Sequence, residues 1–325
     1  MNETMLTAIY AVLSAFVFAV VLCPVFIPYL TRLKFGQNVR DDGPQTHLKK
    51  AGTPTMGGIV IVISLVVAAL LFSQGHIEAL IVLFATVSNG LIGFMDDYIK
   101  VVKKRSLGLR SYQKIICQLI TTGILSWLMY GQGVSTAIFI PFTNGYYLDL
   151  GLLFYPFVFF IMLGASNGSN LTDGADGLNT GVTILVAIFF LFVAYAMGSP
   201  LLPLLGAAVG ALLGFLLFNS HPARMFMGDT GSLALGGLVG STALMLGMPV
   251  LLGIVGFVYV AQSLSVMMQV GYFKLTKGKR IFKMAPLHHH FEQCGWPETR
   301  VVAMFHIVTA ILCLVGFLAT NGLFK

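Results

Sequence analysis

Ten long apolar runs limit what this chain can fold into. They lie at residues 6–30, 55–72, 79–95, 115–130, 152–166, 182–197, 201–218, 233–246, 250–273 and 301–319. A helix that crosses the hydrocarbon core of a bilayer needs about 17 to 25 apolar residues. Most of the runs are close to that length. The runs 152–166 and 233–246 are short, so they define the ends of their helices only approximately. The sequence therefore predicts an all-α polytopic membrane protein with about ten transmembrane helices.

Charge is scarce along the chain. Only 10% of its 325 residues are charged, whereas 57% are hydrophobic. A soluble domain has about 25% charged residues. Because so few charges cannot coat a protein of this size, much of its surface must face lipid. The first run lacks the basic start and the A-x-A exit of a signal peptide, and no linker divides the chain. We expect one integral membrane domain over residues 1–325.

The positive charges predict the orientation. If successive loops alternate sides, 18 of the 19 Lys and Arg residues share one side, and only Lys325 lies on the other. Cytoplasmic loops carry the Lys/Arg excess, so both termini are expected to face outward. This topology and attraction to anionic lipids explain the net charge of +7. Nucleic-acid binding is not expected, because it needs basic patches interleaved with exposed aromatic residues.

The outward loops and the cysteines offer little chemistry. The loop 131–151 contains the alternating stretch NGYYLDL, which predicts a small β-hairpin around Asn144 and Gly145. The four cysteines lack CxxC spacing, so neither a disulfide framework nor a thiol metal site is indicated. They are Cys23, Cys117, Cys294 and Cys313.

Carboxylates gather at the inward ends of the predicted helices. These are Asp96, Asp97, Asp173, Asp176, Asp229 and Glu292, six of the 12 acidic residues. A carboxylate near hydrocarbon is costly and needs a partner. A single one is best explained by snorkelling into the headgroups or by pairing with a lysine. Five aspartates on one face indicate a functional site.

Asp96 and Asp97 end the third run, in the stretch FMDDYIK. Adjacent side chains diverge by about 100° on a helix, so one can point into the bundle while the other faces the loop. Lys100 follows at a spacing that allows pairing with either carboxylate. Two interpretations remain open: a helix-end salt bridge, or a site for a divalent cation or for orienting a phosphate.

Two glycine-rich stretches suit anion binding. In NLTDGADGLN, residues 170–179, Asp173 and Asp176 lie among glycines that bring backbone amides close to a ligand. The alternative is a polar turn with Asp as a helix cap. In AGTPTMGG, residues 51–58, Thr53 suits an N-cap and Pro54 the first helical position. That helix start would present free amides to an anion, next to Lys50.

Two further inward stretches are unusual. FNSHPARMFMGDTGS, residues 218–232, places Asp229 directly before a helix start, and its Phe226 either stacks on a base or anchors at the interface. PLHHHFE, residues 286–292, has three consecutive histidines. A zinc site formed by these histidines and Cys294 is disfavoured because neighbouring side chains point apart. Hydrogen bonds from the imidazoles to phosphate and sugar fit better.

Taken together, the inward face offers carboxylates for a hard cation, and lysines and histidines for phosphate. This combination predicts metal-assisted phosphoryl transfer. Magnesium suits such a site, because it binds one or two carboxylates together with substrate phosphates.

The stretches GTPTMGG, DDYIK, NLTDGADGL, FMGDTGS and PLHHHFE occur in the order found in a known family. They resemble the polyprenyl-phosphate N-acetylhexosamine-1-phosphate transferase superfamily and, within it, the phospho-N-acetylmuramoyl-pentapeptide transferases. The resemblance covers essentially the whole chain. It implies a magnesium-dependent enzyme of the bacterial plasma membrane, commonly a homodimer. It also implies transfer of phospho-MurNAc-pentapeptide from UDP-MurNAc-pentapeptide to undecaprenyl phosphate, which gives lipid I and UMP for peptidoglycan synthesis.

The resemblance also implies roles for single residues. Asp229 matches the metal-binding aspartate, Asp96 and Asp97 match the pair that handles the lipid phosphate, and His288 opens the histidine motif. Ala175 departs from the bulkier residue expected there. The expected substrate-binding residues are Lys50, Thr55, Lys114, Asn170, Asp173, Asp176, Asn219, Phe226, His289 and His290.

Alternatives remain in substrate, class and mechanism. A sibling transferase that uses UDP-GlcNAc is the nearest rival, and the HHHFE string argues against it. A cation-coupled transporter would place its charged residues near the midplane of several helices, where this chain has mainly Gln262 and Gln269. Direct attack of the lipid phosphate on the pyrophosphate is preferred to a phospho-enzyme formed on an Asp. Asp96 or Asp97 is expected to act more as a positioner than as an obligatory base, since a phosphate monoester with a pKa of about 6 is already ionised.

Overall fold

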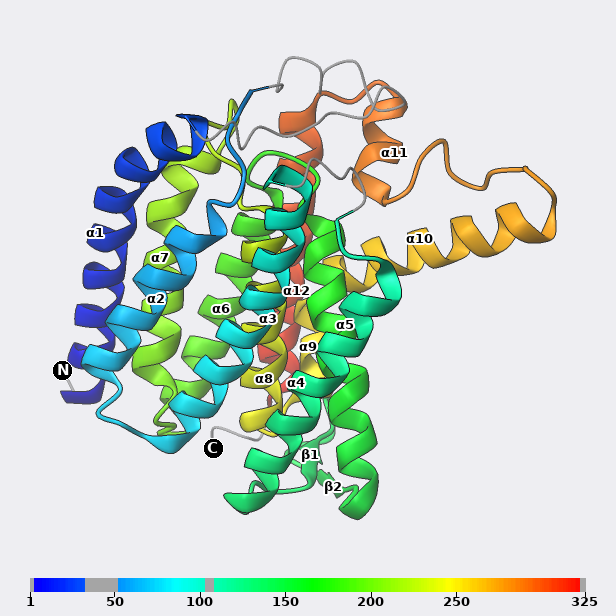
Figure 1. Cartoon of the computed structure of the whole chain (residues 1–325). Helices are drawn as coiled ribbons and strands as arrows, with labels where there is room; N and C mark the ends of the chain where they lie inside the picture. Colours follow the sequence, from blue (N-terminus) through cyan, green and yellow to red (C-terminus); the bar gives the residue numbers. More distant parts are fainter. Residues whose placement is uncertain (1–2, 33–51, 103–107, 322–325) are drawn as a thin grey trace.

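The structure is a computed structural model that describes residues 3–32, 52–102 and 108–321. Lys50, an expected substrate-binding residue, lies outside these residues. The described part of the chain is all-helical apart from one small hairpin (Figure 1). The helices are α1 (Glu3–Arg32), α2 (Gly58–Phe72), α3 (Ile77–Val102), α4 (Ser111–Gly131), α5 (Phe154–Thr172), α6 (Leu178–Ala196), α7 (Leu202–Asn219), α8 (Gly228–Met245), α9 (Pro249–Val255), α10 (Phe257–Leu275), α11 (Leu287–Gln293) and α12 (Glu298–Ala319).

Each of the ten predicted runs is mainly helical, so the all-α prediction is confirmed. By length and apolar composition, six of the described helices can cross a membrane, and a seventh span results if α9 and α10 are counted as one broken helix. These six are α1, α3, α5 with the preceding turn, α6, α7 and α12. The chain is therefore consistent with a polytopic membrane protein.

The helices of the bundle run alternately up and down, which separates two ends (Figure 1). One end carries the hairpin of β1 (Ala137–Phe139) and β2 (Tyr147–Asp149), which pair antiparallel. The start of α1 and the end of α12 lie at that end too, as the hydrogen bond from Phe142 N to Ala319 O shows. The hairpin confirms the prediction, and Asn144 and Gly145 have φ values of 54° and 95°, as a tight turn requires.

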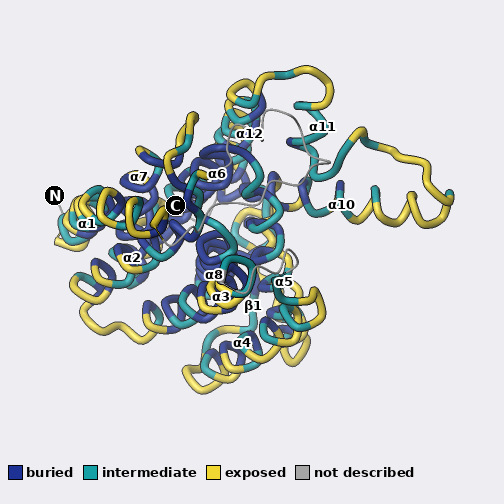
Figure 2. Tube along the Cα trace, turned by 45° about the horizontal axis from the view of Figure 1, so that its top comes forward, coloured by how far each residue is buried: buried dark blue, intermediate teal, exposed yellow. Residues whose placement is uncertain are grey.

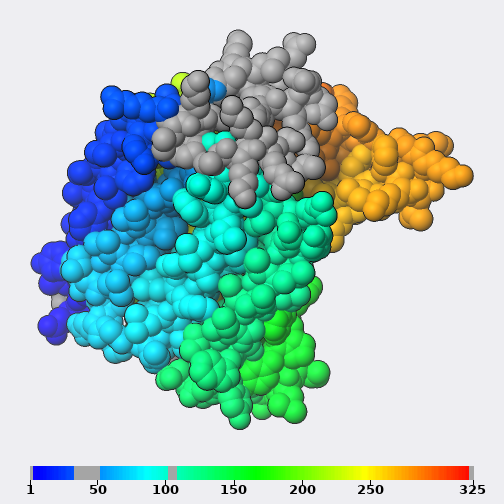
Figure 3. Space-filling view, viewed as in Figure 1, coloured from blue at the N-terminus to red at the C-terminus, as the bar shows by residue number. Residues whose placement is uncertain are grey.

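The run 250–273 does not form the single continuous helix that its length predicted. It is broken into α9 and α10, which are bent by 80°. The break falls at Gly256, where a Cβ atom would lie 2.8 Å from Leu252 O. Glycine permits this close approach, and apolar composition alone does not reveal it. As a result α10 projects sideways from the bundle (Figures 1 and 3).

Helix α8 forms the centre of the bundle, and its residues from Thr230 to Leu244 are all buried (Figure 2). Its small residues allow neighbouring backbones to approach closely. A Cβ on Gly236 would lie 2.3 Å from Ser166 Cα in α5, and one on Gly237 would lie 2.7 Å from Ala85 O in α3. Such packing of small residues is typical of helices in membranes. Lipid tails are as apolar as the side chains there, so the hydrophobic effect does not drive the helices together and close packing matters more.

The contact between α3 and α8 gives a prediction at Gly93. A Cβ added there would lie 2.0 Å from Asp229 O, so the helices would have to separate at the start of α8. We expect Gly93→Ala to destabilise the protein by about 1–3 kcal/mol in thermal unfolding, as overpacking does. The matched control is Gly164→Ala on α5, where no atom lies within 4 Å of the new Cβ. Equal stability of the two variants would contradict the close contact.

Candidate active site

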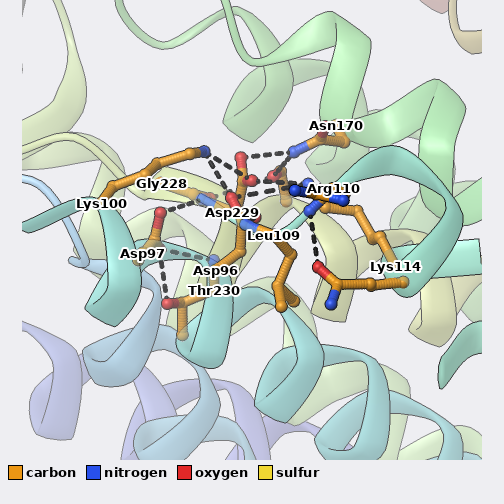
Figure 4. A network of polar contacts seen from close by, with 12 residues as sticks. Asp96, Asp97, Lys100, Leu109, Arg110, Lys114, Asn170, Gly228, Asp229 and Thr230 are labelled. Atoms are coloured by element: carbon orange, nitrogen blue, oxygen red, sulfur yellow. Dashed lines mark hydrogen bonds and ion pairs between the residues drawn. The ribbon is translucent and has the colours of Figure 1, made fainter. Parts of the chain in front are cut away.

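Four helix ends meet at the end of the bundle opposite the hairpin. Helices α3 and α5 finish there, whereas α4 and α8 begin there (Figure 1). Side chains more than 100 residues apart therefore come into contact. Asp96, Asp97, Lys114, Asn170 and Asp229, all singled out from the sequence, belong to this one group (Figure 4).

Asp229, in the first turn of α8, lies at the centre of the group. Its Oδ2 accepts hydrogen bonds from Lys100 Nζ at 2.9 Å and from Lys114 Nζ at 2.8 Å. Its Oδ1 accepts one from Asn170 Nδ2 at 2.8 Å. Three helices thus hold one carboxylate, which is only partly exposed. Its position at a helix start favours negative charge there.

Asp97 joins α3 to the start of α8. Its carboxylate accepts hydrogen bonds from the backbone N–H of Asp229 at 3.2 Å and of Thr230 at 2.9 Å. The Thr230 hydroxyl donates a third bond, at 2.7 Å. The first N–H groups of a helix have no partner within the helix, so a buried carboxylate from α3 satisfies them here. Asp97 therefore fixes where α8 begins.

Asp96 has different bonding partners from Asp97, but both carboxylates converge on Asp229 and neither is turned out to the loop. Asp96 accepts a hydrogen bond from Leu109 N, in the connection to α4, at 2.7 Å. It also pairs with Lys100, four residues later, and lies 3.6 Å from Lys114 Nζ. Both aspartates are buried. The helix-end salt bridge expected for this pair is present, and it also includes Asp229.

Asp96, Asp97 and Asp229 form a group whose carboxylate oxygens can hold a metal ion, with one oxygen from each lying within 4.8 Å of the others. We name these three residues the acidic cluster. When all groups are ionised, its three carboxylates exceed the two ammonium groups of Lys100 and Lys114 by one negative charge. Hard divalent cations prefer such oxygen ligands. The residues present therefore fit Mg²⁺.

A second group forms around Asp176, in the loop between α5 and α6. Its Oδ2 accepts a hydrogen bond from Ala223 N at 3.0 Å and lies 3.1 Å from His221 Nδ1. Its backbone N–H donates to Glu298 Oε1 at 2.7 Å. The three side chains could also hold a metal ion. Asp176 thus connects the loop after α7 and the start of α12 with its own loop.

The alternative of a polar turn with Asp as a helix cap holds in part. The N-cap of α6 is Gly177, with φ of 74°, and no side chain caps it. Asp173 instead follows α5 as its C-cap residue and is half-buried. Glycine adopts the left-handed conformation at Gly177 without strain, so neither aspartate caps α6.

The histidine stretch forms the short helix α11, and its three rings point to different partners. The buried His288 lies with Nδ1 3.2 Å from Gln262 Oε1, and a Cβ on Gly174 would meet its ring. His289 Nδ1 lies 2.9 Å from Glu292 Oε2. His290 Nδ1 accepts a hydrogen bond from Lys283 N. No candidate metal group within the described ranges includes these histidines.

The mid-helix glutamines of α10 serve this same region. Gln262 contacts His288, and Gln269 Oε1 accepts hydrogen bonds from the backbone of Ile281 and Phe282 in the connection to α11. The side-chain oxygens of both glutamines therefore have partners in this region, whereas Gln262 Nε2 is buried with no hydrogen-bond partner among the described residues.

The predicted start of α2 is wrong. The helix begins at Gly58, not at Pro54, and Thr53 does not cap it. The backbone of Pro54 accepts a hydrogen bond from Phe226 N, and Gly57 N and Gly58 N donate to the carbonyls of Phe226 and Met227. These amides are therefore not available to an anion. Thr55 remains close to the acidic cluster, because a Cβ on Gly228 would meet both Thr55 Oγ1 and Asp97 Oδ2.

Asn219 is the last residue of α7, and Phe226 lies in the loop between α7 and α8. Asn219 is buried, accepts a hydrogen bond from Thr180 Oγ1 at 2.7 Å and donates one to Met225 O at 3.0 Å. It thereby holds the loop that carries the half-buried Phe226.

Sequence reasoning did not assign five residues to the site: Lys100, Thr230, His221, Glu298 and Gln262. Lys100 was expected only as a partner of the Asp96–Asp97 pair. The stretches SHPAR and WPET place His221 and Glu298 on inward loops, but their pairing with Asp176 depends on tertiary structure.

Comparisons with known proteins point to one family. A family model described as glycosyl transferase family 4 matches residues 79–247. A second, described as phospho-N-acetylmuramoyl-pentapeptide-transferase signature 1, matches residues 50–62. The chain is 51% identical over 314 residues to the phospho-N-acetylmuramoyl-pentapeptide-transferase of Clostridium kluyveri, covering 96% of this chain and 98% of the relative. It is 49% identical over 311 residues to that of Clostridium perfringens strain 13, covering 95% and 97%.

Proposed function

Because the chain belongs to the phospho-N-acetylmuramoyl-pentapeptide-transferase family, we propose that it makes lipid I in peptidoglycan synthesis. The substrates are UDP-MurNAc-pentapeptide and undecaprenyl phosphate, and the second product is UMP. The observation that carries the proposal is the acidic cluster with its two lysines, held together by four helix ends. Such a site can bind a cation and two phosphate groups at the edge of the apolar bundle.

The reaction brings two anions together, and their repulsion is the main electrostatic obstacle. At contact, each charge pair costs about 4 kcal/mol at an effective dielectric constant of 20. Bound Mg²⁺ would neutralise pyrophosphate charge and template in-line displacement. Asp229 would hold it, with Asp96 and Asp97 as close neighbours. The ammonium groups of Lys100 and Lys114 supply further positive charge.

The chain's own residues favour direct attack of the lipid phosphate oxygen on the pyrophosphate. The Asp97 carboxylate already accepts three hydrogen bonds from the start of α8. These bonds hold it in place and occupy its oxygens, which suits a positioning residue better than a nucleophile or a base. Asp96, which faces Leu109 and Lys100, is the better candidate to lie beside the incoming lipid phosphate.

We propose that the loops around Asp176 and Phe226, together with the histidines of α11, bind the nucleotide and sugar. Asp173 and Asp176 lie in the loop after α5, Asn219 ends α7 and bonds to the loop that carries Phe226, and His288 packs against Gly174. Phe226 would stack on the uracil. His288, His289 and His290 would contact phosphate and sugar oxygens. Lys50 is retained as a phosphate-binding residue on the strength of the family resemblance.

The membrane arrangement is part of the proposal. We propose ten spans in the bacterial plasma membrane, with both termini outside, the acidic cluster at the cytoplasmic face and a homodimer as the assembly. The segregation of positive charge supports this orientation. The start of α1 and the end of α12 lie at the same end of the bundle, which agrees with placing both termini on one side of the membrane.

One assay in detergent tests the substrates. Purified protein with undecaprenyl phosphate and Mg²⁺ is offered UDP-MurNAc-pentapeptide or UDP-GlcNAc in separate reactions. We expect UMP and lipid I only from the first. Turnover of UDP-GlcNAc alone would overturn the substrate assignment, and UMP release without the lipid acceptor would support a phospho-enzyme.

A further inference from the structure

A second polar layer lies deeper in the bundle, below the acidic cluster. Gln118 Nε2 on α4 donates a hydrogen bond to Ser166 Oγ on α5 at 3.2 Å, and the Ser166 hydroxyl donates to Asn89 Oδ1 on α3 at 3.0 Å. Asn167 Nδ2 donates to Gln118 Oε1 at 3.0 Å. Gln118, Ser166 and Asn89 are each at most 3% exposed. Both ends of the Gln118 amide are therefore bonded inside the protein.

The members of this layer stand on the helices that carry the acidic cluster and its partners. Gln118 follows Lys114 by four residues on α4, and Ser166 precedes Asn170 by four residues on α5. Residues at this spacing share one helix face, about 6 Å apart along the axis. The rotation of α4 that places Gln118 against α5 is thus the one that aims Lys114 at Asp229.

Among the buried residues of α4, Gln118 lies nearest to Lys114, whereas Thr122, Leu125, Ser126 and Met129 lie further along the helix. The outer face of α4 is apolar and exposed, with Ile116 at 50%, Ile120 at 59% and Trp127 at 70% exposure. Apolar contacts with lipid have no preferred direction, whereas an interhelical hydrogen bond does. Directional contacts close to Lys114 therefore come from Gln118.

We propose that Gln118 is a positioning residue that aims the Lys114 ammonium at Asp229, through its bonds to Ser166 and Asn167. The inference rests on the proposed role of the acidic cluster. It goes beyond that role because the hydrogen bonds of the Gln118 side chain go to Ser166 and Asn167 and not to the carboxylates of the cluster. The Lys114–Asp229 distance of 2.8 Å is the geometry that it protects.

A double-mutant cycle of Gln118→Leu and Lys114→Met tests the inference. A misplacement of about 1 Å can cost about 100-fold in rate, so we expect Gln118→Leu to lower kcat by about 10- to 100-fold, with little change in the KM for UDP-MurNAc-pentapeptide. The double variant should be no slower than Lys114→Met alone, because Gln118 acts through that lysine. Thr122→Val, a nearly isosteric change at a buried position one turn deeper on α4, is the matched control and should retain activity.

Binding of Mn²⁺ gives a second readout that does not depend on turnover. The Lys114 ammonium repels a cation at Asp229, so Lys114→Met should bind Mn²⁺ more tightly, and Gln118→Leu should shift the affinity in the same direction. Additive losses in kcat, or unchanged Mn²⁺ binding in folded Gln118→Leu, would overturn the positioning role while leaving the proposed function standing. Full activity of Lys114→Met would instead remove the proposed role of the cluster, and the inference with it.

Discussion

Asp229→Asn is expected to lower kcat by about 10²- to 10³-fold, the range seen when a group that stabilises transition-state charge is removed. The replacement keeps the shape of the side chain and leaves an oxygen for Asn170 Nδ2. It removes the charge that Lys100 and Lys114 neutralise and that a divalent cation requires. The acidic cluster would then carry no net negative charge against the two lysines. The kinetics are measured in detergent as a function of Mg²⁺ concentration.

The matched control for that variant is Asp149→Asn in β2. Asp149 is exposed at the hairpin end, where the Thr136 hydroxyl and Gly151 N–H donate hydrogen bonds to it and lower the pKa of its carboxyl. It lies at the opposite end of the bundle from the acidic cluster, so its loss should leave kcat unchanged. If Asp229→Asn kept near-normal turnover and Mg²⁺ dependence, the proposed metal-binding role would be wrong.

Asp97→Asn should cost both stability and activity, because Asp97 holds the start of α8. One of the two carboxylate oxygens becomes an NH₂ group, which cannot accept a hydrogen bond from Asp229 N or Thr230 N. The interaction of a negative charge with the helix start is lost as well. We expect a fall in kcat of about 100-fold or more together with a lower melting temperature in thermal unfolding.

The pH profile of Asp97→Asn separates positioning from base catalysis. A positioning residue predicts that raising the pH does not restore activity, since the displaced start of α8 is unaffected by hydroxide. Recovery at high pH would favour a general base instead. Thr230→Val removes one of the three bonds to Asp97 and should give a smaller loss in the same direction.

The helices could be predicted from the sequence because long apolar runs have few alternatives in a membrane protein. The hairpin followed from Asn144 and Gly145, which suit a turn with positive φ. The break at Gly256 could not be predicted, because glycine is common in unbroken membrane helices and only its contact with Leu252 O reveals the bend. The start of α2 was misplaced because backbone bonds to Phe226 and Met227 replaced local capping.

The acidic residues of the site could also be predicted from the sequence, since carboxylates at the boundary of an apolar segment need an explanation. The hydrogen bonds that these residues make with distant parts of the chain could not be predicted. Asp97 was recognised as a candidate, but its bonds to α8 join residues 132 and 133 positions apart. Gln118 stands in no motif at all, and its layer appears only when three helices are placed side by side.

Thiol labelling tests the central claim, that the acidic cluster and α11 lie at the cytoplasmic end. The exposed native Cys294 follows α11, and the exposed Thr143 in the turn of the hairpin can be replaced by cysteine in a Cys294→Ser background. Both proteins carry Cys117→Ser, and Cys23 and Cys313 are buried. An impermeant maleimide added to intact cells should label Thr143→Cys and not Cys294, and inverted vesicles should give the reverse. Labelling of Cys294 from outside the cell would contradict the account.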